Sequence, residues 1–193
     1  MLRSTIIGLL AFASLQAGAT AADDAGLWQR LKGGGYVVVM RHATTTPGVG
    51  DPPGFTLDDC TTQRNLSSGG RADAQAIGAA FNRNKVLVGR VLTSRWCRCV
   101  DTAELAFGRA EPAEMLDSIW QQDGAARERK VAAVRKHAAS YREPGNLVLV
   151  THDVNVRALT GESLAQGEMV VARARADGTL EVLGTLDVPR PVR

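Results

Sequence analysis

Two short apolar runs in this sequence each end in residues that could do chemistry. The first run is Tyr36–Met40, followed by Arg41 and His42, and the second is Leu147–Thr151, followed by His152 and Asp153. Such runs are typical of strands that are buried on both faces of a parallel sheet. Because ligands of open α/β sheets bind beyond the carboxyl ends of the strands, we expect both histidines to lie at a ligand-binding edge.

The first pair of residues combines a nucleophile with a phosphate-binding group. A neutral imidazole, such as that of His42, is a competent nucleophile near neutral pH, whereas a serine hydroxyl needs an added base. A guanidinium, such as that of Arg41, stays charged and binds phosphate oxygens through two N–H groups at once. These residue types suit the transfer of a phosphoryl group to His42.

Three segments of the chain resemble the histidine phosphatase superfamily, which includes phosphoglycerate mutases and histidine acid phosphatases. In order, they are Arg41-His42-Ala43, similar to the family's Arg-His-Gly signature; Ser94 to Ala103, similar to its Ser-x-x-x-Arg-x-x-x-Thr-Ala segment; and His152 to Asn155, similar to the His-Asp-x-Asn segment of the acid phosphatase branch. Ala43 departs from the glycine of the signature. The resemblance implies a three-layer α/β/α core that needs no metal or other cofactor.

The resemblance also implies the catalytic roles. His42 would form a phosphohistidine that water then hydrolyses. Arg41, Arg98 and His152 would stabilise the charge on the phosphoryl oxygens. Arg98 matches the family arginine by its spacing, four residues after Ser94.

The proton donor has more than one candidate. In the acid phosphatase branch, the aspartate that corresponds to Asp153 protonates the leaving group. An aspartate near a helix start is also a common helix cap. In the mutase branch a glutamate from a different segment is the donor, and Glu114 and Asp117 are the candidates for that role here.

Three further residues are predicted to bind substrate: Thr45, Arg64 and Asn155. Thr45 stands where the acid phosphatase pattern has an arginine and the mutase branch has a threonine. Gln63 and Arg64 follow a long loop, residues 43–59, which is rich in proline and glycine and begins directly after His42. Such loops are usually functional or disordered, and the pair either reaches substrate or lies on the surface. Asn155 either orients substrate or caps a helix.

The remaining pattern predicts alternating helices and strands. Helices are expected at residues 23–31, 69–81, 94–108 and 125–141 and from residue 154, and a further strand at 90–93, with an irregular link at 111–124. Two strand-like runs, 168–174 and 180–186, flank Asp177-Gly178, which is a hairpin signal. The fold class is therefore α/β: a three-layer α/β/α sandwich with a mainly parallel sheet and a C-terminal hairpin.

The N-terminal segment has the features of a secretory signal peptide. Arg3 precedes an apolar stretch at residues 6–15, and small residues at 17–21 provide cleavage sites. We expect a signal peptide at 1–21, a histidine phosphatase domain at 22–193, and a periplasmic or secreted protein. No later segment is long enough to span a bilayer, so no stable membrane insertion is expected.

Export would permit disulfides, and the chain has three cysteines, Cys60, Cys97 and Cys99. Cys97 and Cys99 are two residues apart on a predicted helix and face different ways. We expect Cys60 to form a disulfide with one of them, which would pin the long loop beside the helix that carries Arg98. The alternative is three separate thiols. The spacing is not that of a zinc site, because it has no Cys-x-x-Cys pair.

Composition narrows the class of partner. The chain has 193 residues, of which 45% are hydrophobic and 22% charged, as in an ordinary single domain. The net charge of +3 is too small to indicate nucleic acid as a partner. A small phosphorylated substrate is expected instead.

These features predict an exported phosphomonoesterase that works through a phosphohistidine. Among small exported members of the family, the resemblance is to proteins that remove phosphate from lipopolysaccharide core heptose, so phosphorylated envelope sugars are the expected substrates. The alternatives are a phosphoprotein or phosphohistidine phosphatase and a non-catalytic phosphate-binding protein on the same fold. A mutase is disfavoured, because mutases usually act on cytoplasmic metabolites.

Overall fold

The computed structural model describes residues 18–188. Its first helix, α1 (Gly18–Lys32), begins before the expected start at residue 23 and ends at the glycine-rich turn. Leu27 and Leu31 of α1 are buried in the core. Residues 1–17, which make up most of the predicted signal peptide, lie outside the described residues.

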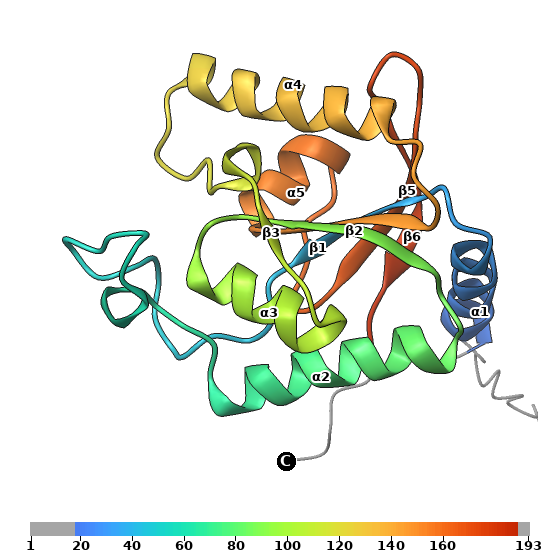
Figure 1. The fold of residues 1–193 in the computed structure, drawn as a ribbon, viewed down its shortest axis with the longest axis horizontal. Coiled ribbons are helices and arrows are strands. Elements are labelled where there is room, and N and C mark those ends of the chain that lie inside the picture. The colour runs from blue at the N-terminus through green and yellow to red at the C-terminus, as the bar shows by residue number, and fades with distance from the viewer. Residues whose placement is uncertain (1–17, 189–193) are drawn as a thin grey trace, which may run out of the picture.

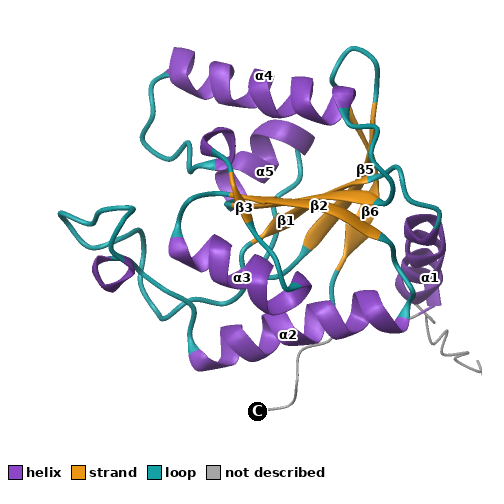
Figure 2. Ribbon diagram, in the orientation of Figure 1, coloured by secondary structure: helices purple, strands orange, loops and turns teal. Residues whose placement is uncertain are grey.

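A six-stranded sheet forms the centre of the domain (Figures 1 and 2). The strands are β1 (Val37–Arg41), β2 (Val88–Thr93), β3 (Glu111–Pro112), β4 (Asn146–Thr151), β5 (Met169–Ala174) and β6 (Leu180–Leu186), in the order β3-β2-β4-β1-β5-β6. β1 to β4 run parallel, whereas β5 is antiparallel to both β1 and β6. The predicted parallel sheet and C-terminal hairpin are both confirmed.

Helices cover both faces of this sheet (Figure 1). One face carries α1, α2 (Ser68–Arg83) and α3 (Cys97–Phe107), and the other carries α4 (Gly124–Ser140) and α5 (Asp153–Thr160). Alternate residues of β1 divide between the layers: Val38 and Met40 pack with the first set, and Val37 and Val39 with the second. The three-layer sandwich is confirmed.

The two strands that precede the histidines lie side by side at the centre of the sheet. Every residue of β4 is buried, as are the first four of β1. Burying a valine or leucine side chain stabilises a fold by about 1.5–3 kcal/mol. The edge that carries the histidines is therefore built on the most deeply packed part of the domain.

Two expectations about local structure need correction. The helix expected at 94–108 begins only at Cys97, because residues 94–96 turn away from the strand before the helix starts. Residues 111–124, expected to be irregular, contain the short strand β3 and the 3₁₀ helix η2 (Glu114–Leu116). β3 is only two residues long and pairs with the end of β2, so no run of alternating residues could have revealed it.

Candidate active site

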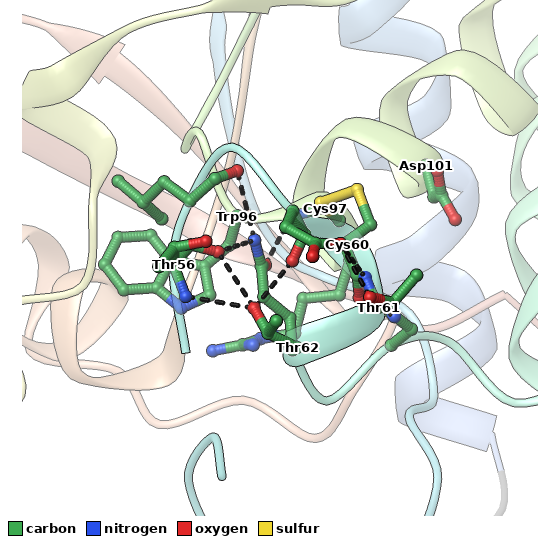
Figure 3. Close-up of a disulfide and its surroundings, with 12 residues drawn as sticks. Thr56, Cys60, Thr61, Thr62, Trp96, Cys97 and Asp101 are labelled. Carbon is green, nitrogen blue, oxygen red and sulfur yellow. Dashed lines mark hydrogen bonds between the residues drawn. A yellow bond between two sulfur atoms is a disulfide. The ribbon is translucent and has the colours of Figure 1, made fainter. Parts of the chain in front are cut away.

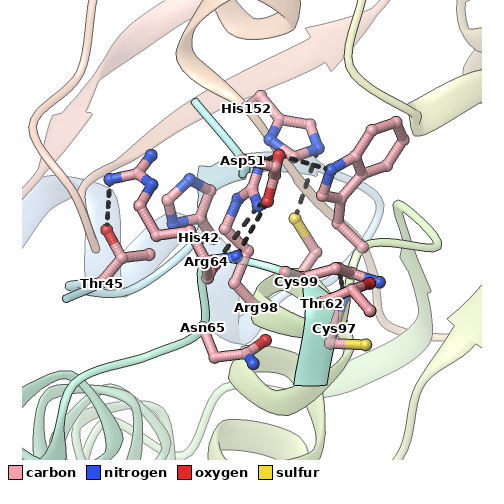
Figure 4. A network of polar contacts seen from close by, with 12 residues as sticks. His42, Thr45, Asp51, Thr62, Arg64, Asn65, Cys97, Arg98, Cys99 and His152 are labelled. Atoms are coloured by element: carbon pink, nitrogen blue, oxygen red, sulfur yellow. Dashed lines mark hydrogen bonds and ion pairs between the residues drawn. The ribbon is translucent and has the colours of Figure 1, made fainter. Parts of the chain in front are cut away.

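β1 and β4 bring the two predicted histidines together. Arg41 pairs with Thr151 in the strand register, so His42 and His152 follow at the same edge. The His42 backbone N–H donates to the Thr151 carbonyl oxygen at 3.0 Å, and the centroids of the two imidazole rings are 5.5 Å apart. Figure 4 shows both rings beside the guanidinium of Arg98.

One hydrogen bond fixes the tautomer of His42. Its Nδ1 atom lies 2.9 Å from the carbonyl oxygen of Ala43. Because a carbonyl oxygen can only accept, Nδ1 carries the hydrogen and Nε2 of the neutral ring carries the lone pair. The Ala43 N–H in turn donates to the Thr102 hydroxyl at 3.0 Å, which holds this carbonyl in place. Nε2 is thus the nitrogen available for attack.

The surroundings of His42 keep its ring neutral. The side chain is almost wholly buried, and burial is the main cause that lowers its pKa from 6.5 to about 3. The charges of Arg98, Arg41 and Arg64 act in the same direction, against the hydrogen bond to Ala43. An unprotonated imidazole beside three cations is suited to attack a group that is itself negatively charged.

The three guanidinium groups come from three different segments. Arg41 ends β1 and donates to the Leu164 carbonyl oxygen at 2.6 Å. Arg64 lies after the long loop and donates to the Thr45 hydroxyl at 2.8 Å, and Arg98 lies in the first turn of α3. The Nε atom of each is buried and has no partner among the described residues. Each arginine therefore keeps a donor for an anion.

His152 contacts a serine, which in turn contacts an aspartate. Its Nε2 atom lies 3.0 Å from the Ser94 hydroxyl, which is 3.4 Å from Oδ1 of Asp117. Burial lowers the pKa of His152 well below 6.5, with the neighbouring imidazole of His42 as the next cause. Asp117 is itself buried and accepts from the backbone and the side chain of Arg95.

These contacts separate the three carboxyl groups considered as proton donors. Asp117 is committed to Ser94 and Arg95, and Glu114 is exposed and 3.7 Å from Arg95. Asp153 begins α5, where its oxygens accept from the Leu164 N–H at 2.8 Å, the Ser163 hydroxyl and the Arg157 guanidinium. It also lies close enough to Arg41 to act on its charge. Asp153 is the only one of these three carboxyl groups whose charge acts on Arg41, and its oxygens, like those of Asp117, already accept hydrogen bonds.

The predicted substrate-binding residues differ in where their polar groups point. The Thr45 hydroxyl accepts from Arg64 and from Gln166, which leaves its own hydrogen free to donate to a bound anion. The Asn155 amide instead bonds the backbone of residues 117 and 119. Both the nitrogen and the oxygen of the Asn155 amide are engaged in these bonds. Asn155 is therefore better explained as a support for that segment than as the predicted substrate contact.

The disulfide joins Cys60 to Cys97 (Figure 3). Cys99 is free and buried. Cys60 lies in the 3₁₀ helix η1 (Cys60–Thr62), and Cys97 is the first residue of α3, next to Arg98. The side chain of Gln63 reinforces the junction, since it accepts from the Cys97 N–H and donates to two loop carbonyls. Gln63 is buried, so the expectation that it lies on the exposed surface is wrong, and its amide contacts the loop and the start of α3.

Asp51 and Trp96 belong to the site but were missed from the sequence. Asp51 accepts two hydrogen bonds from the Arg98 guanidinium and one from the Trp96 indole at 2.9 Å. In the sequence it stands between a glycine and two prolines, which is an ordinary place for an aspartate in a turn. The only available signal was that the loop is too long to be a simple connection.

Comparison with known proteins supports the fold assignment. The sequence matches no family model and no curated protein. The structure is similar to that of the protein histidine phosphatase SixA complexed with tungstate, at 16% identity and a TM-score of 0.54 over 78% of this chain and 96% of that one. It is also similar to phosphoglycerate mutase from Thermus thermophilus, at 19% identity and a TM-score of 0.51 over 80% of this chain and 99% of that one.

The chain has the histidine phosphatase fold. At these identities the similarity establishes the shared architecture, and the chemistry has to be argued from the side chains at the site. In this histidine phosphatase fold, the ends of β1 and β4 carry His42 and His152, the residues that the sequence motifs single out. Among the described residues, no helix is both long and apolar enough to cross a membrane, and no group of His, Cys, Asp and Glu side chains could hold a metal ion.

Proposed function

We propose that this protein is an exported phosphomonoesterase that forms a phosphohistidine on His42. The observation that carries the proposal is the state of the His42 ring. Its Nδ1 hydrogen is held by the Ala43 carbonyl, its Nε2 lone pair is free, and three arginines lie close enough to lower its pKa. A neutral nucleophile inside a cationic pocket is what attack on a phosphate ester needs.

In the first step, the Nε2 lone pair of His42 attacks phosphorus and the bond from phosphorus to the ester oxygen breaks. Asp153, in its protonated form, gives its proton to the departing oxygen. Arg41 and Arg98 stabilise the charge on the transferring oxygens, and Arg64 and Thr45 bind the same group from the loop side. His152 joins them in the protonated form that the arriving anion favours, which has a second N–H besides the one that faces Ser94. In the second step, water attacks phosphorus, its proton passes to the Asp153 carboxylate, and the bond between nitrogen and phosphorus breaks to release phosphate.

The proposed substrates are small phosphorylated molecules of the cell envelope, such as sugar phosphates of lipopolysaccharide core heptose. The Cys60–Cys97 disulfide supports export, because disulfides persist in oxidising compartments such as the periplasm. We also propose that residues 1–21 are a signal peptide. N-terminal sequencing of the secreted or periplasmic protein should then begin near Ala22, and an intact Met1 would exclude cleavage.

A second candidate is a phosphohistidine phosphatase. It is favoured by the structural similarity to the protein histidine phosphatase SixA. A phosphohistidine protein and a sugar phosphate make different demands on Asp153, since an imidazole leaves from phosphorus more easily than a sugar alkoxide. The two substrates can therefore be separated by rate.

The test is turnover of p-nitrophenyl phosphate with and without a chelator, followed by kcat/KM for heptose phosphate and for a phosphohistidine peptide. We expect activity that survives chelation, an acid-labile phosphate on His42 in quenched samples, and a higher kcat/KM for the sugar phosphate. A higher value for the peptide would select the second candidate. If the protein bound phosphate but turned over none of these three substrates, it would be a non-catalytic phosphate-binding protein.

A further inference from the structure

The carboxylate of Asp51 occupies a complete anion-binding site. Its Oδ1 accepts from the Arg98 guanidinium at 2.7 Å and from the Arg64 backbone N–H at 3.0 Å. Its Oδ2 accepts from the Trp96 indole N–H at 2.9 Å and from the second Arg98 nitrogen at 3.2 Å. Two oxygens therefore receive four hydrogen bonds, which is the full capacity of a carboxylate.

The site is buried and lies next to the nucleophile. The side chains of Arg98 and Asp51 are only 5% and 7% exposed. Figure 4 shows the Asp51 carboxylate between Arg98 and His152, with the His42 ring beside them. Guanidinium groups bind carboxylate and phosphate with the same two-pronged geometry. Asp51 thus occupies the guanidinium of Arg98, which in the proposed function binds the phosphoryl group transferred to His42.

The chain on either side of Asp51 is exposed and is tied to the fold by hydrogen bonds from the Thr46 N–H to the Asn65 carbonyl oxygen and from the Arg64 guanidinium to the Gly48 carbonyl oxygen. Residues 46–50 and 52–54 are exposed, and Gly50 and Gly54 have positive φ angles of 71° and 81°. By contrast, the disulfide at Cys60 fastens the far end of the loop to α3. Moving Asp51 outward would break its hydrogen bonds but would disturb little apolar packing.

We propose that Trp96 and the backbone N–H of Arg64 complete the phosphoryl pocket around Arg98, and that Asp51 is a built-in anion which a phosphoryl group must displace. The proposal rests on the proposed function, since it takes Arg98 as a phosphoryl-binding residue. The Asp51 carboxylate and a phosphoryl group cannot hold the same four donors at once. Substrate binding therefore opens the loop that carries Asp51, and substrates whose anion competes poorly with this carboxylate are rejected.

The first test measures tungstate binding by calorimetry in the full-length secreted protein and in Asp51→Asn. Removing the competing charge should lower the dissociation constant for tungstate about tenfold or more. In the unaltered protein the anion site is open only when Asp51 has left Arg98, and the variant no longer pays this cost. Asp58→Asn is the matched control: Asp58 lies on the same loop, is exposed and has no contact with Arg98. It should change the dissociation constant less than about twofold, as expected for a solvated charge. Unchanged or weaker binding by Asp51→Asn would show instead that Asp51 permanently supports Arg98.

A second variant tests the pocket itself. Trp96→Phe removes the indole N–H but keeps an aromatic ring against Phe55 and His152. In the Asp51→Asn background it should weaken tungstate binding about threefold to tenfold, the usual effect of losing one hydrogen bond to an anion. No change in this background would remove Trp96 from the pocket and overturn that part of the proposal.

The unaltered protein gives a test that does not depend on how a variant folds. Saturating tungstate should speed amide hydrogen exchange at Thr46 and Phe55, the hydrogen-bonded amides on either side of Asp51, because the loop loses its anchor at Asp51. Slower or unchanged exchange there would mean that the anion binds with the loop in place, which refutes displacement. Turnover of p-nitrophenyl phosphate is measured separately and tests the proposed function. Turnover without faster exchange would refute only the displacement of Asp51, and faster exchange without turnover would refute only the phosphatase activity.

Discussion

His42 and His152 follow paired residues of two neighbouring parallel strands, and the centroids of their rings are 5.5 Å apart. The strands are parallel and adjacent, so one register fixes the spacing of the two rings. The Ala43 carbonyl then orients one ring, and Ser94 orients the other. The relative positions of the two histidines thus depend on backbone pairing, and their chemistry depends on two local hydrogen bonds.

Replacing His42, the proposed nucleophile, should abolish turnover without unfolding the protein. We expect His42→Ala to lower kcat for p-nitrophenyl phosphate by roughly 10⁴-fold or more, the order seen when an enzyme nucleophile is removed, and to form no phosphoenzyme. His137→Ala is the control, because His137 is a half-buried histidine on α4, away from the site. Rapid-quench labelling and thermal unfolding of both variants check this, and full activity in folded His42→Ala would rule out the assignment.

The ring of His42 should not titrate in the ordinary range for histidine. Since its pKa is lowered to about 3, the ring stays neutral between pH 8 and pH 5. Its ring signals in NMR spectra should therefore hold constant over that range. A His42 midpoint near pH 6.5 would contradict the burial that the structure gives it.

The same lowered pKa makes stability depend on pH. Below pH 6.5 the unfolded chain binds a proton at His42, whereas the folded chain does not until about pH 3. The free energy of unfolding should therefore be highest above pH 6.5 and fall as the pH drops toward 3. Denaturant titrations at pH 7 and pH 4.5 measure the loss, which should be smaller in His42→Gln because glutamine does not titrate.

The disulfide should stabilise the fold through the chain it closes. Cys60 and Cys97 are 37 residues apart, for which loop-closure entropy gives about 3–4 kcal/mol. Cys60→Ser and Cys97→Ser should each lose about this much free energy of unfolding, and the double variant little more, since both remove the same bond. Thiol titration of the denatured protein, purified without reductant, should find one free thiol, that of Cys99. Three free thiols would show that the bond is absent.

Asp153→Asn should slow the release of poor leaving groups more than that of good ones. General acid catalysis is worth about 10²–10⁴-fold, so a sugar phosphate should suffer by this amount while p-nitrophenyl phosphate, whose leaving group needs no proton, changes little. Arg98→Ala should slow both substrates alike, because it acts on the transferring group. The rate of phosphoenzyme formation, measured for each substrate with each variant, distinguishes the two roles.

Asp177→Asn is the control for this experiment, since Asp177 is an exposed aspartate in the turn between β5 and β6. It should leave the ratio of the two substrates unchanged. Equal losses on both substrates in Asp153→Asn would instead indicate a positioning role. Asp153 accepts from the Leu164 N–H, and the Leu164 carbonyl accepts from Arg41, so a shift there would reach the phosphoryl group.

Local patterns along the chain were enough to predict the α/β class and the placement of the histidines. Buried strands reveal themselves as runs of valine and leucine, and a residue that directly follows such a run must lie at the sheet edge. That is why Arg41, His42 and His152 could be placed before the fold was known. The hairpin at Asp177 and Gly178 was equally visible, because its turn chemistry is local.

Which side chains meet at the site could be learned only from the folded chain. Asp51 is 47 residues from Arg98 in sequence, and Cys60 could have paired with either of two cysteines. The amides of Gln63 and Asn155 proved to bond the backbone. Such contacts depend on where loops return to the sheet, and loop paths follow from packing and hydrogen bonds between distant segments, which leave no periodic trace in the sequence.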